Sequence, residues 1–144
     1  MSPDKNAMKN PSYRQVCSGT SGHVEILFVE LNDATPALVE EVIKFFFQFH
    51  DPTTKNRQGN DVGTQYASHI FVTDSQQNEI ADRVVKELQI LVDKKDVSYA
   101  SETVSTLISD ANEFYEAHDE HQDYLMKNPN GYCNHYFRFK SWPA

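Results

Sequence analysis

The sequence predicts a layered fold of the α/β or α+β class, with helices packed on a small sheet. Short apolar runs rich in β-branched residues alternate along the chain with longer amphipathic stretches, which indicates strands followed by helices. Hydrophobic residues make up 39% of the chain and aromatic residues 12%, which favours a packed core. A length of 144 residues fits one domain, so we expect residues 1–144 to fold as a single unit.

The first strand is expected at His23–Leu31, where the sequence HVEILFVEL suits a strand covered on both faces. Counting by twos places Glu25 on the same face as Leu27 and Val29, so its carboxyl would lie along an apolar row. Such surroundings raise the pKa of a carboxyl, because burial disfavours its charged form. Glu25 is therefore a candidate proton donor, with a structural Glu paired to a Lys, Arg or Tyr as the alternative.

The first long helix is expected to begin at Thr35. Thr35 suits the N-cap and Pro36 the first helical position, while Glu40 lies near the positive end of the helix dipole. Apolar residues then follow helical spacing: Val39, Val42, Ile43, Phe46 and Phe49 or His50. This pattern predicts an amphipathic helix that packs on the sheet.

A long polar segment, His50–Tyr66, follows this helix. Structureless loops of such length are uncommon in a compact domain and are usually functional or disordered. Gly59 and Gly63 permit tight turns, and the Asp, Asn and Thr side chains can bond to the backbone. The segment is therefore expected to hold a defined shape, either as part of a site or because its polar groups satisfy one another.

The remaining elements continue the alternation. We expect a strand at Ser68–Thr73, a helix capped by Ser75, a third strand at Thr103–Ser109 and a helix from about Asn112 to Lys127. The apolar stripe of the helix after Ser75 contains Ile80, Val84, Val85, Leu88 and Val92. Aromatic residues of the tail, 134–144, are expected to pack back on the domain.

Charge and hydropathy exclude several classes of partner. The formal net charge of −8 repels phosphate backbones, so nucleic acid is not expected as a partner. We also expect no membrane partner, because no apolar run approaches the roughly 18 residues of a membrane span. The first residues, MSPDKNAMKN, lack the apolar centre of a signal peptide. An intracellular protein is expected.

Two histidines and two cysteines could carry chemistry. His118 and His121 are spaced for one helix face, but two ligands without HExxH make a metal site the weaker interpretation. The alternative has one histidine facing water and the other hydrogen-bonded in the core. Cys17 precedes the first predicted strand and is expected to be buried and inert. Cys133 follows the turn sequence NPNGY, so we expect an accessible thiol that can travel to another sulfur.

Four blocks of sequence resemble A-type peptide methionine sulfoxide reductases: NPSYRQVCSGTSGHVE, FHDPTTKNRQGNDVGTQY, FYEAHDEHQDYL and KNPNGYC. The resemblance covers Asn10 to Cys133, and the middle block is the most specific. It implies an α+β fold, a two-layer α/β sandwich with a ferredoxin-like core. It also implies thiol-dependent reduction of methionine S-sulfoxide, in oxidised proteins or as free methionine.

The resemblance assigns roles to five residues. Glu25 is implied to protonate or hydrogen-bond the sulfoxide oxygen, and Tyr13 and Tyr66 to hold the same oxygen through their hydroxyls. Asp61 is implied to order the pocket, and Cys133 to be the resolving thiol. No cofactor is implied, because electrons come from thioredoxin or another dithiol. A cytoplasmic monomer is expected.

The attacking cysteine of the family lies in a GCFWG block upstream of NPxY, and this sequence contains no such block. Cys17 matches a different, non-nucleophilic cysteine of the family. We therefore expect the chain to lack the nucleophile segment together with the first strand and first helix of the family fold. The alternative function is a catalytically inactive chain that acts at most as a binding module for oxidised methionine.

Overall fold

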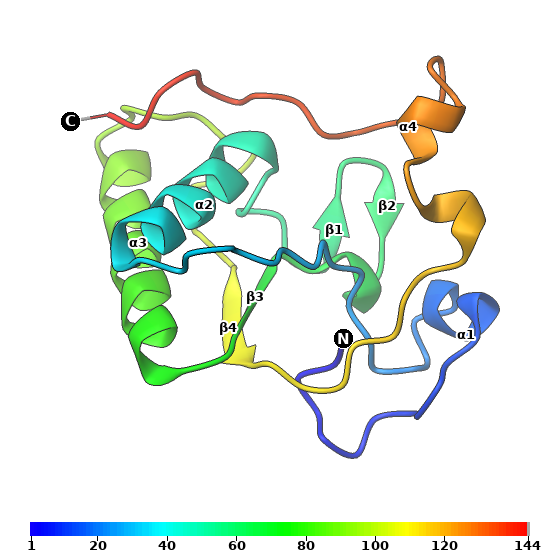
Figure 1. Cartoon of the computed structure of the whole chain (residues 1–144). Helices are drawn as coiled ribbons and strands as arrows, with labels where there is room; N and C mark the ends of the chain where they lie inside the picture. The colour runs from blue at the N-terminus through cyan, green and yellow to red at the C-terminus, as the bar shows by residue number, and fades with distance from the viewer. Residues whose placement is uncertain (144) are drawn as a thin grey trace.

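Two helices and a two-stranded parallel sheet form the core of the protein (Figure 1). The structure is a computed structural model and describes residues 1–143. Strand β3 (His69–Val72) pairs in parallel with β4 (Leu107–Asp110), with His69 opposite Leu107 and Val72 opposite Asp110. Helix α3 (Ser75–Asp93) follows β3, as a parallel pair requires a crossover connection. Helix α2 (Pro36–Phe49) packs against α3, and the α+β class is confirmed.

Both long helices begin at side-chain caps. The hydroxyl of Thr35 accepts a hydrogen bond from the Leu38 N–H at 3.3 Å, and Pro36 opens α2 as predicted. The cap of α3 is Asp74, whose carboxylate accepts from the Gln77 N–H at 2.8 Å. Ser75 is therefore the first helical residue, and its prediction as the cap was wrong by one position.

The hydrophobic core lies where α2 and α3 meet the sheet. Four residues of the predicted α3 stripe are buried, Ile80, Val84, Leu88 and Val92, and Val85 packs against them. In α2 the buried residues are Val39, Ile43 and Phe47, a row spaced by four. Phe47 is fully buried, whereas the predicted Phe46 is only partly buried. Consecutive phenylalanines left the sequence ambiguous, and packing against α3 and the sheet selects Phe47.

The polar segment after α2 is ordered, as expected. Its residues form a short hairpin of β1 (Arg57–Gln58) and β2 (Asp61–Val62), followed by the 3₁₀ helix η1 (Thr64–Tyr66). Buried Asp51 holds the start of the segment. One carboxylate oxygen accepts from the Thr53 N–H and hydroxyl at 2.9 and 2.6 Å, and the other accepts from the Ala100 N–H at 3.0 Å. Asp51 is thus a structural carboxylate that fixes the base of the hairpin.

The predicted strand at residues 23–31 is absent. The backbone there forms hydrogen bonds only at its start, where Val24 exchanges them with Met1 and the Glu25 N–H donates to the Gln65 carbonyl. Leu27, Phe28 and Val29 are 86%, 57% and 48% exposed, so the run is not covered on both faces. A strand needs a neighbour to supply its hydrogen bonds, and in the described residues no strand pairs with 26–31.

Two later elements also differ from prediction. The third strand is β4, which begins at Leu107 and overlaps only the end of the predicted 103–109. The helix predicted from about Asn112 to Lys127 was wrong. The structure has a 3₁₀ turn, η2 (Asp119–His121), and one short helix, α4 (Tyr124–Lys127), separated by Asp123 at a φ of 51°. A left-handed residue cannot continue an α-helix, so the apolar pattern is split.

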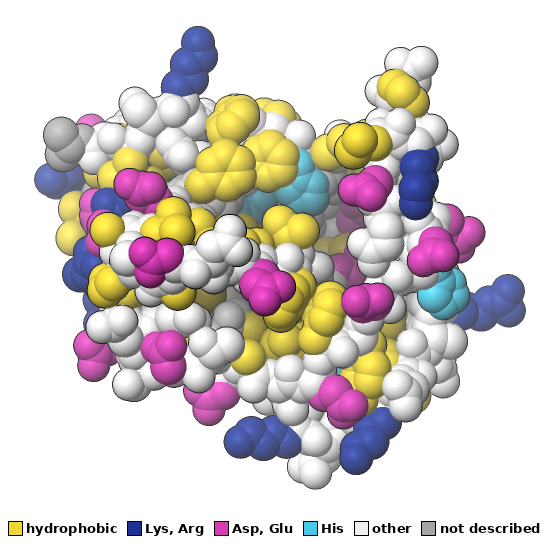
Figure 2. Space-filling view, viewed as in Figure 1, with side chains coloured by type: hydrophobic (Ala, Val, Ile, Leu, Met, Phe, Trp, Pro, Cys, Tyr) yellow, Lys and Arg dark blue, Asp and Glu magenta, His cyan; other side chains and the backbone are white. Residues whose placement is uncertain are grey.

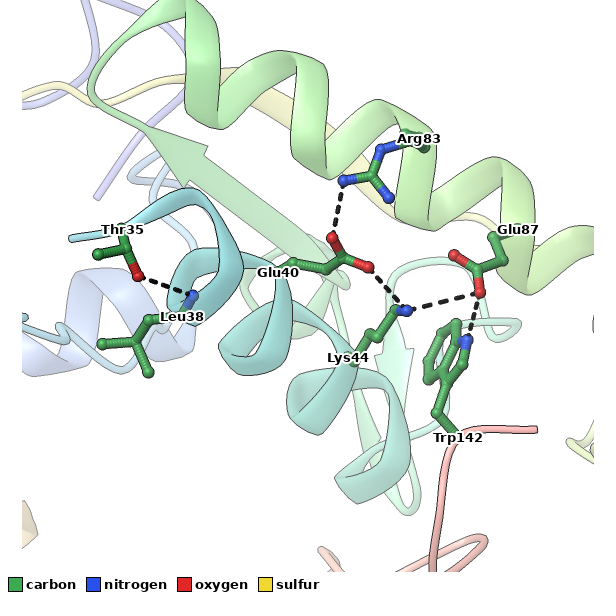
Figure 3. Close-up of polar contacts among 7 residues, drawn as sticks. All are labelled: Thr35, Leu38, Glu40, Lys44, Arg83, Glu87 and Trp142. Carbon is green, nitrogen blue, oxygen red and sulfur yellow. Dashed lines mark hydrogen bonds and ion pairs between the residues drawn. The ribbon is translucent and has the colours of Figure 1, made fainter. Parts of the chain in front are cut away.

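The C-terminal tail crosses the molecule as an extended strap, from α4 back to α2 and α3 (Figure 1). Its far end is held by a polar network (Figure 3): the Trp142 indole N–H donates to Glu87 at 2.6 Å, and Lys44 bridges Glu87 and Glu40. Phe139 and Trp142 pack on the core, as expected of the tail, whereas Tyr136 and Phe137 are more than half exposed. Across residues 1–143 no helix is long and apolar enough to span a bilayer.

Candidate active site

The first wall of the candidate site is the short helix α1 (Tyr13–Cys17). A reciprocal capping box between Ser12 and Gln15 fixes its start. Tyr13 is the first helical residue and is partly exposed, and Cys17 lies four residues later on the same helix face. The neighbouring Cys17 thiol, as a hydrogen-bond partner, and burial raise the pKa of Tyr13 to about 12. The phenol therefore stays protonated and can donate a hydrogen bond at neutral pH.

Glu25 lies beside the end of the polar segment. Its backbone N–H donates to the Gln65 carbonyl at 2.9 Å, which brings Glu25 next to Tyr66 in space. The side chain remains accessible, yet partial burial raises the pKa of the Glu25 carboxyl. The Asp61 charge raises this pKa further, and His121 opposes the shift. The predicted direction is thus confirmed, but the apolar row was the wrong cause, because Leu27 and Val29 face solvent.

Tyr66 is the last residue of η1, and its phenol is close enough to Glu25 for the two groups to interact. Burial raises the pKa of its phenol, and the charges of Glu25 and Cys17 act in the same direction. The neighbouring Gln65 is buried and joins η1 to α1, since its carboxamide N–H donates to the Cys17 carbonyl at 2.8 Å. Through Gln65 the hairpin segment is held against α1.

Asp61 and Cys133 lie on the side of the site near the tail. Asp61 is in β2, and its carboxylate accepts from the Asn134 carboxamide at 2.7 Å. Its charge contributes to the raised pKa of both Glu25 and Tyr66. Cys133 precedes Asn134 and is exposed, as predicted for an accessible thiol. Cys17 is only partly buried, so the prediction of a buried thiol was wrong.

His121, considered in the sequence as a possible metal ligand, is a neighbour of the site, and this position was not predicted. Its ring stacks on Tyr13 with centroids 4.5 Å apart, and His118 lies farther off at 6.1 Å. His118 faces water, as one alternative held, but His121 has a ring contact rather than the expected hydrogen bond in the core. Among the described residues no group of three His, Cys, Asp or Glu side chains could hold a metal ion. No local sequence signal pairs Tyr13 with His121.

The structure therefore brings Tyr13, Glu25, Asp61 and Tyr66 together from three separate segments of the chain. Figure 2 shows the molecule hollowed between hydrophobic side chains near α2 and the side that carries α4, with acidic side chains around the hollow. The pKa values of the two phenols and of the Glu25 carboxyl are raised, which favours the protonated forms that can donate a hydrogen bond. Such donors suit a strongly polarised neutral oxygen as ligand.

The family is decided by comparison with known proteins. The model of the peptide methionine sulfoxide reductase family matches residues 5–142. The chain belongs to this family. It is 43% identical to the probable peptide methionine sulfoxide reductase of Schizosaccharomyces pombe, over 89% of this chain and 72% of that protein. It is 41% identical to the peptide methionine sulfoxide reductase MsrA of Pasteurella multocida, over 88% of this chain and 68% of that protein.

Solved structures agree with the family. Mxr1 from Saccharomyces cerevisiae in reduced form superposes with a TM-score of 0.77 and 36% identity, over 94% of this chain and 71% of that chain. The function is accordingly that of a peptide methionine sulfoxide reductase, an oxidoreductase that reduces methionine sulfoxide at the expense of a thiol.

Proposed function

We propose that Glu25, Tyr13 and Tyr66 bind the sulfoxide oxygen, and that Asp61 orders the hairpin that leads into Tyr66. The observation that carries this proposal is the convergence of three groups with raised pKa values from α1, the extended segment and η1. A sulfoxide oxygen bears partial negative charge and accepts hydrogen bonds, and its basicity rises as the sulfur–oxygen bond weakens. A carboxyl with a raised pKa keeps its proton available for that oxygen.

The chemistry then passes the oxygen from one sulfur to another. A thiolate attacks the sulfoxide sulfur while Glu25 supplies a proton to the oxygen, which leaves methionine and a sulfenic acid. A second thiol displaces the oxygen of the sulfenic acid as water and closes a disulfide, and we assign this resolving role to exposed Cys133. An external dithiol reopens the disulfide by thiol exchange.

The attacking thiol is the catalytic group for which the 144 residues offer the least evidence. Their cysteines are Cys17 and Cys133, and no GCFWG block occurs among them. The second candidate is a chain that binds oxidised methionine without reducing it. Incubation of the purified chain with a methionine sulfoxide peptide and dithiothreitol separates the two, because turnover excludes the binding-only function.

Several finer features rest on family membership. We propose the S-epimer of methionine sulfoxide as substrate, in oxidised proteins or as the free amino acid, and a thioredoxin-like dithiol as electron donor. We also propose that residues 1–144 form one domain that acts as a monomer in the cytoplasm. The match of the family model to residues 5–142 supports the single domain.

Binding experiments test the oxygen pocket apart from turnover. A fluorescent peptide is titrated in its methionine sulfoxide form and in its unoxidised form, and we expect only the first to bind well. Tyr66→Phe and Glu25→Ala should each weaken sulfoxide binding about tenfold, as loss of one hydrogen bond of roughly 1.4 kcal/mol implies. Tyr136→Phe is the matched control, because Tyr136 is an exposed tail phenol. Equal binding of both peptide forms would contradict the proposal.

A further inference from the structure

The Asn134 side chain joins the tail to the hairpin of the candidate site. Its carboxamide nitrogen donates to the Asp61 carboxylate at 2.7 Å and to the Gln58 carbonyl at 2.8 Å. A carboxamide has two N–H groups, so both bonds can form together. One acceptor is a carboxylate, which makes that bond stronger than one between neutral groups. Asn134 is also half-buried, so water competes less for these bonds.

The hairpin turn is shaped to receive this side chain. Gly59 lies between β1 and β2 with a φ of 59°, a conformation that favours glycine. A Cβ at Gly59 would lie 3.0 Å from the Asn134 Cβ and 3.1 Å from its nitrogen. The absence of a side chain at Gly59 therefore leaves the space that Asn134 fills.

Asn134 is also the residue at which the tail becomes attached to the rest of the domain. Before it, residues 124–133 are mostly exposed, and their backbone bonds are local, such as Gly131 to Asn128. After it, the tail is joined to α2: His135 stacks on Phe49 and the Arg138 N–H donates to the Gln48 carbonyl at 2.8 Å. Cys133 is thus the last residue before the tail becomes attached to the domain.

We infer that Asn134 is a positioning residue, whose bonds to Asp61 and Gln58 hold the adjacent Cys133 at the hairpin wall of the sulfoxide pocket. The inference rests on the proposed role of Cys133 as resolving thiol. That thiol must stay near the pocket to reach a sulfur oxidised there, yet it lies in an exposed segment that would otherwise move freely. Asn134 supplies the restraint at the nearest possible position in the chain.

Spin labelling tests the restraint directly. In a Cys17→Ser background a nitroxide is attached to Cys133, and its mobility is measured by electron paramagnetic resonance. We expect a restricted spectrum in the parent and a mobile one in Asn134→Ala. In Asn134→Asp two carboxylates face each other, so the label should be mobile at pH 7 and restricted again at lower pH, once the pair shares a proton. A residue with a merely structural role would not give this pH-dependent rescue.

Two controls keep the test decisive. Asn128→Ala removes an exposed upstream carboxamide and should leave the spectrum of the Cys133 label unchanged. Trp142 is the single tryptophan, and unchanged emission in every variant shows that the far end of the strap and the fold are intact. A parent-like spectrum in Asn134→Ala would overturn the inference. The measurement involves neither sulfoxide nor reductant, so its failure is distinct from failure of the proposed function.

Discussion

The imidazole ring of His121 stacks on the phenol ring of Tyr13, with centroids 4.5 Å apart and planes 26° apart. The two residues are far apart in sequence, and this contact brings η2 against α1. It also brings the His121 ring close enough to Glu25 to act on its carboxyl. A residue outside the oxygen pocket therefore helps to set the proton affinity of the acid inside it.

Replacing His121 should raise the pKa of Glu25. His121 opposes the upward shift of this pKa, so His121→Phe, which keeps an aromatic ring against Tyr13, removes the opposing charge and leaves burial and Asp61 to act. Carbon-13 NMR titration of the glutamate carboxyls measures the change. His118→Phe is the control, because His118 faces water. A Glu25 titration unchanged by His121→Phe would refute this prediction.

Sulfoxide binding should depend on pH through Glu25. The donor is the protonated carboxyl, so we expect affinity to be greatest at low pH and to fall, up to about tenfold, as pH rises through the raised pKa of Glu25. In Glu25→Gln a neutral amide N–H replaces the acid, and the affinity should become independent of pH over that range. Fluorescence anisotropy with the sulfoxide peptide records both profiles. A pH dependence shared equally by the parent and Glu25→Gln would assign it to another group.

Stability should fall on acidification because of His50. Burial lowers the pKa of His50 to about 4, and its ring nitrogens lie 2.6 Å from the Phe46 carbonyl oxygen and 2.7 Å from the Ser68 hydroxyl. The unfolded chain binds the proton at a higher pH than the folded chain. The stabilisation that neutral, buried His50 gives the folded state is therefore complete above about pH 6.5. It is lost as pH falls from 6.5 to 4, and the loss in the free energy of unfolding is on the order of 3 kcal/mol.

Urea unfolding across this pH range measures the effect. His50→Gln should be less stable at neutral pH but should lose less stability on acidification than the parent. Some dependence should remain, because burial also lowers the pKa of His69 to about 4. His118→Gln, at an exposed position, should behave as the parent does. Parallel stability curves for His50→Gln and the parent would rule out His50 as the cause.

Phe47→Ala should destabilise the protein by about 3–5 kcal/mol, because Phe47 is fully buried between α2, α3 and the sheet and its removal leaves a cavity. Phe45→Ala is a matched control two residues away, with Phe45 at 49% exposed, and should cost much less. Denaturant unfolding compares the two variants. Similar losses of stability would mean that Phe47 does not occupy the core as described.

The long helices could be predicted closely because their signals are local. Thr35 and Pro36 mark a helix start within a few residues, and the buried stripe of α3 repeats at helical spacing. The prediction of a strand at residues 23–31 was wrong because strand formation depends on non-local contacts. The β-branched composition of this run records a preference, but a strand forms only where a partner supplies hydrogen bonds, and the run has none in residues 1–143.

The candidate site likewise has features that the sequence predicts and features that depend on the tertiary structure. The sequence by itself determined the family and the N-cap of α2, because these depend on motifs and short-range spacing. Only the tertiary structure decided that His121 lies on Tyr13, that Glu25 is desolvated by distant segments rather than by an apolar row of its own, and that Asn134 bonds Asp61. Each of these contacts joins segments distant in the chain. Their geometry depends on how the whole domain packs, and no local pattern encodes it.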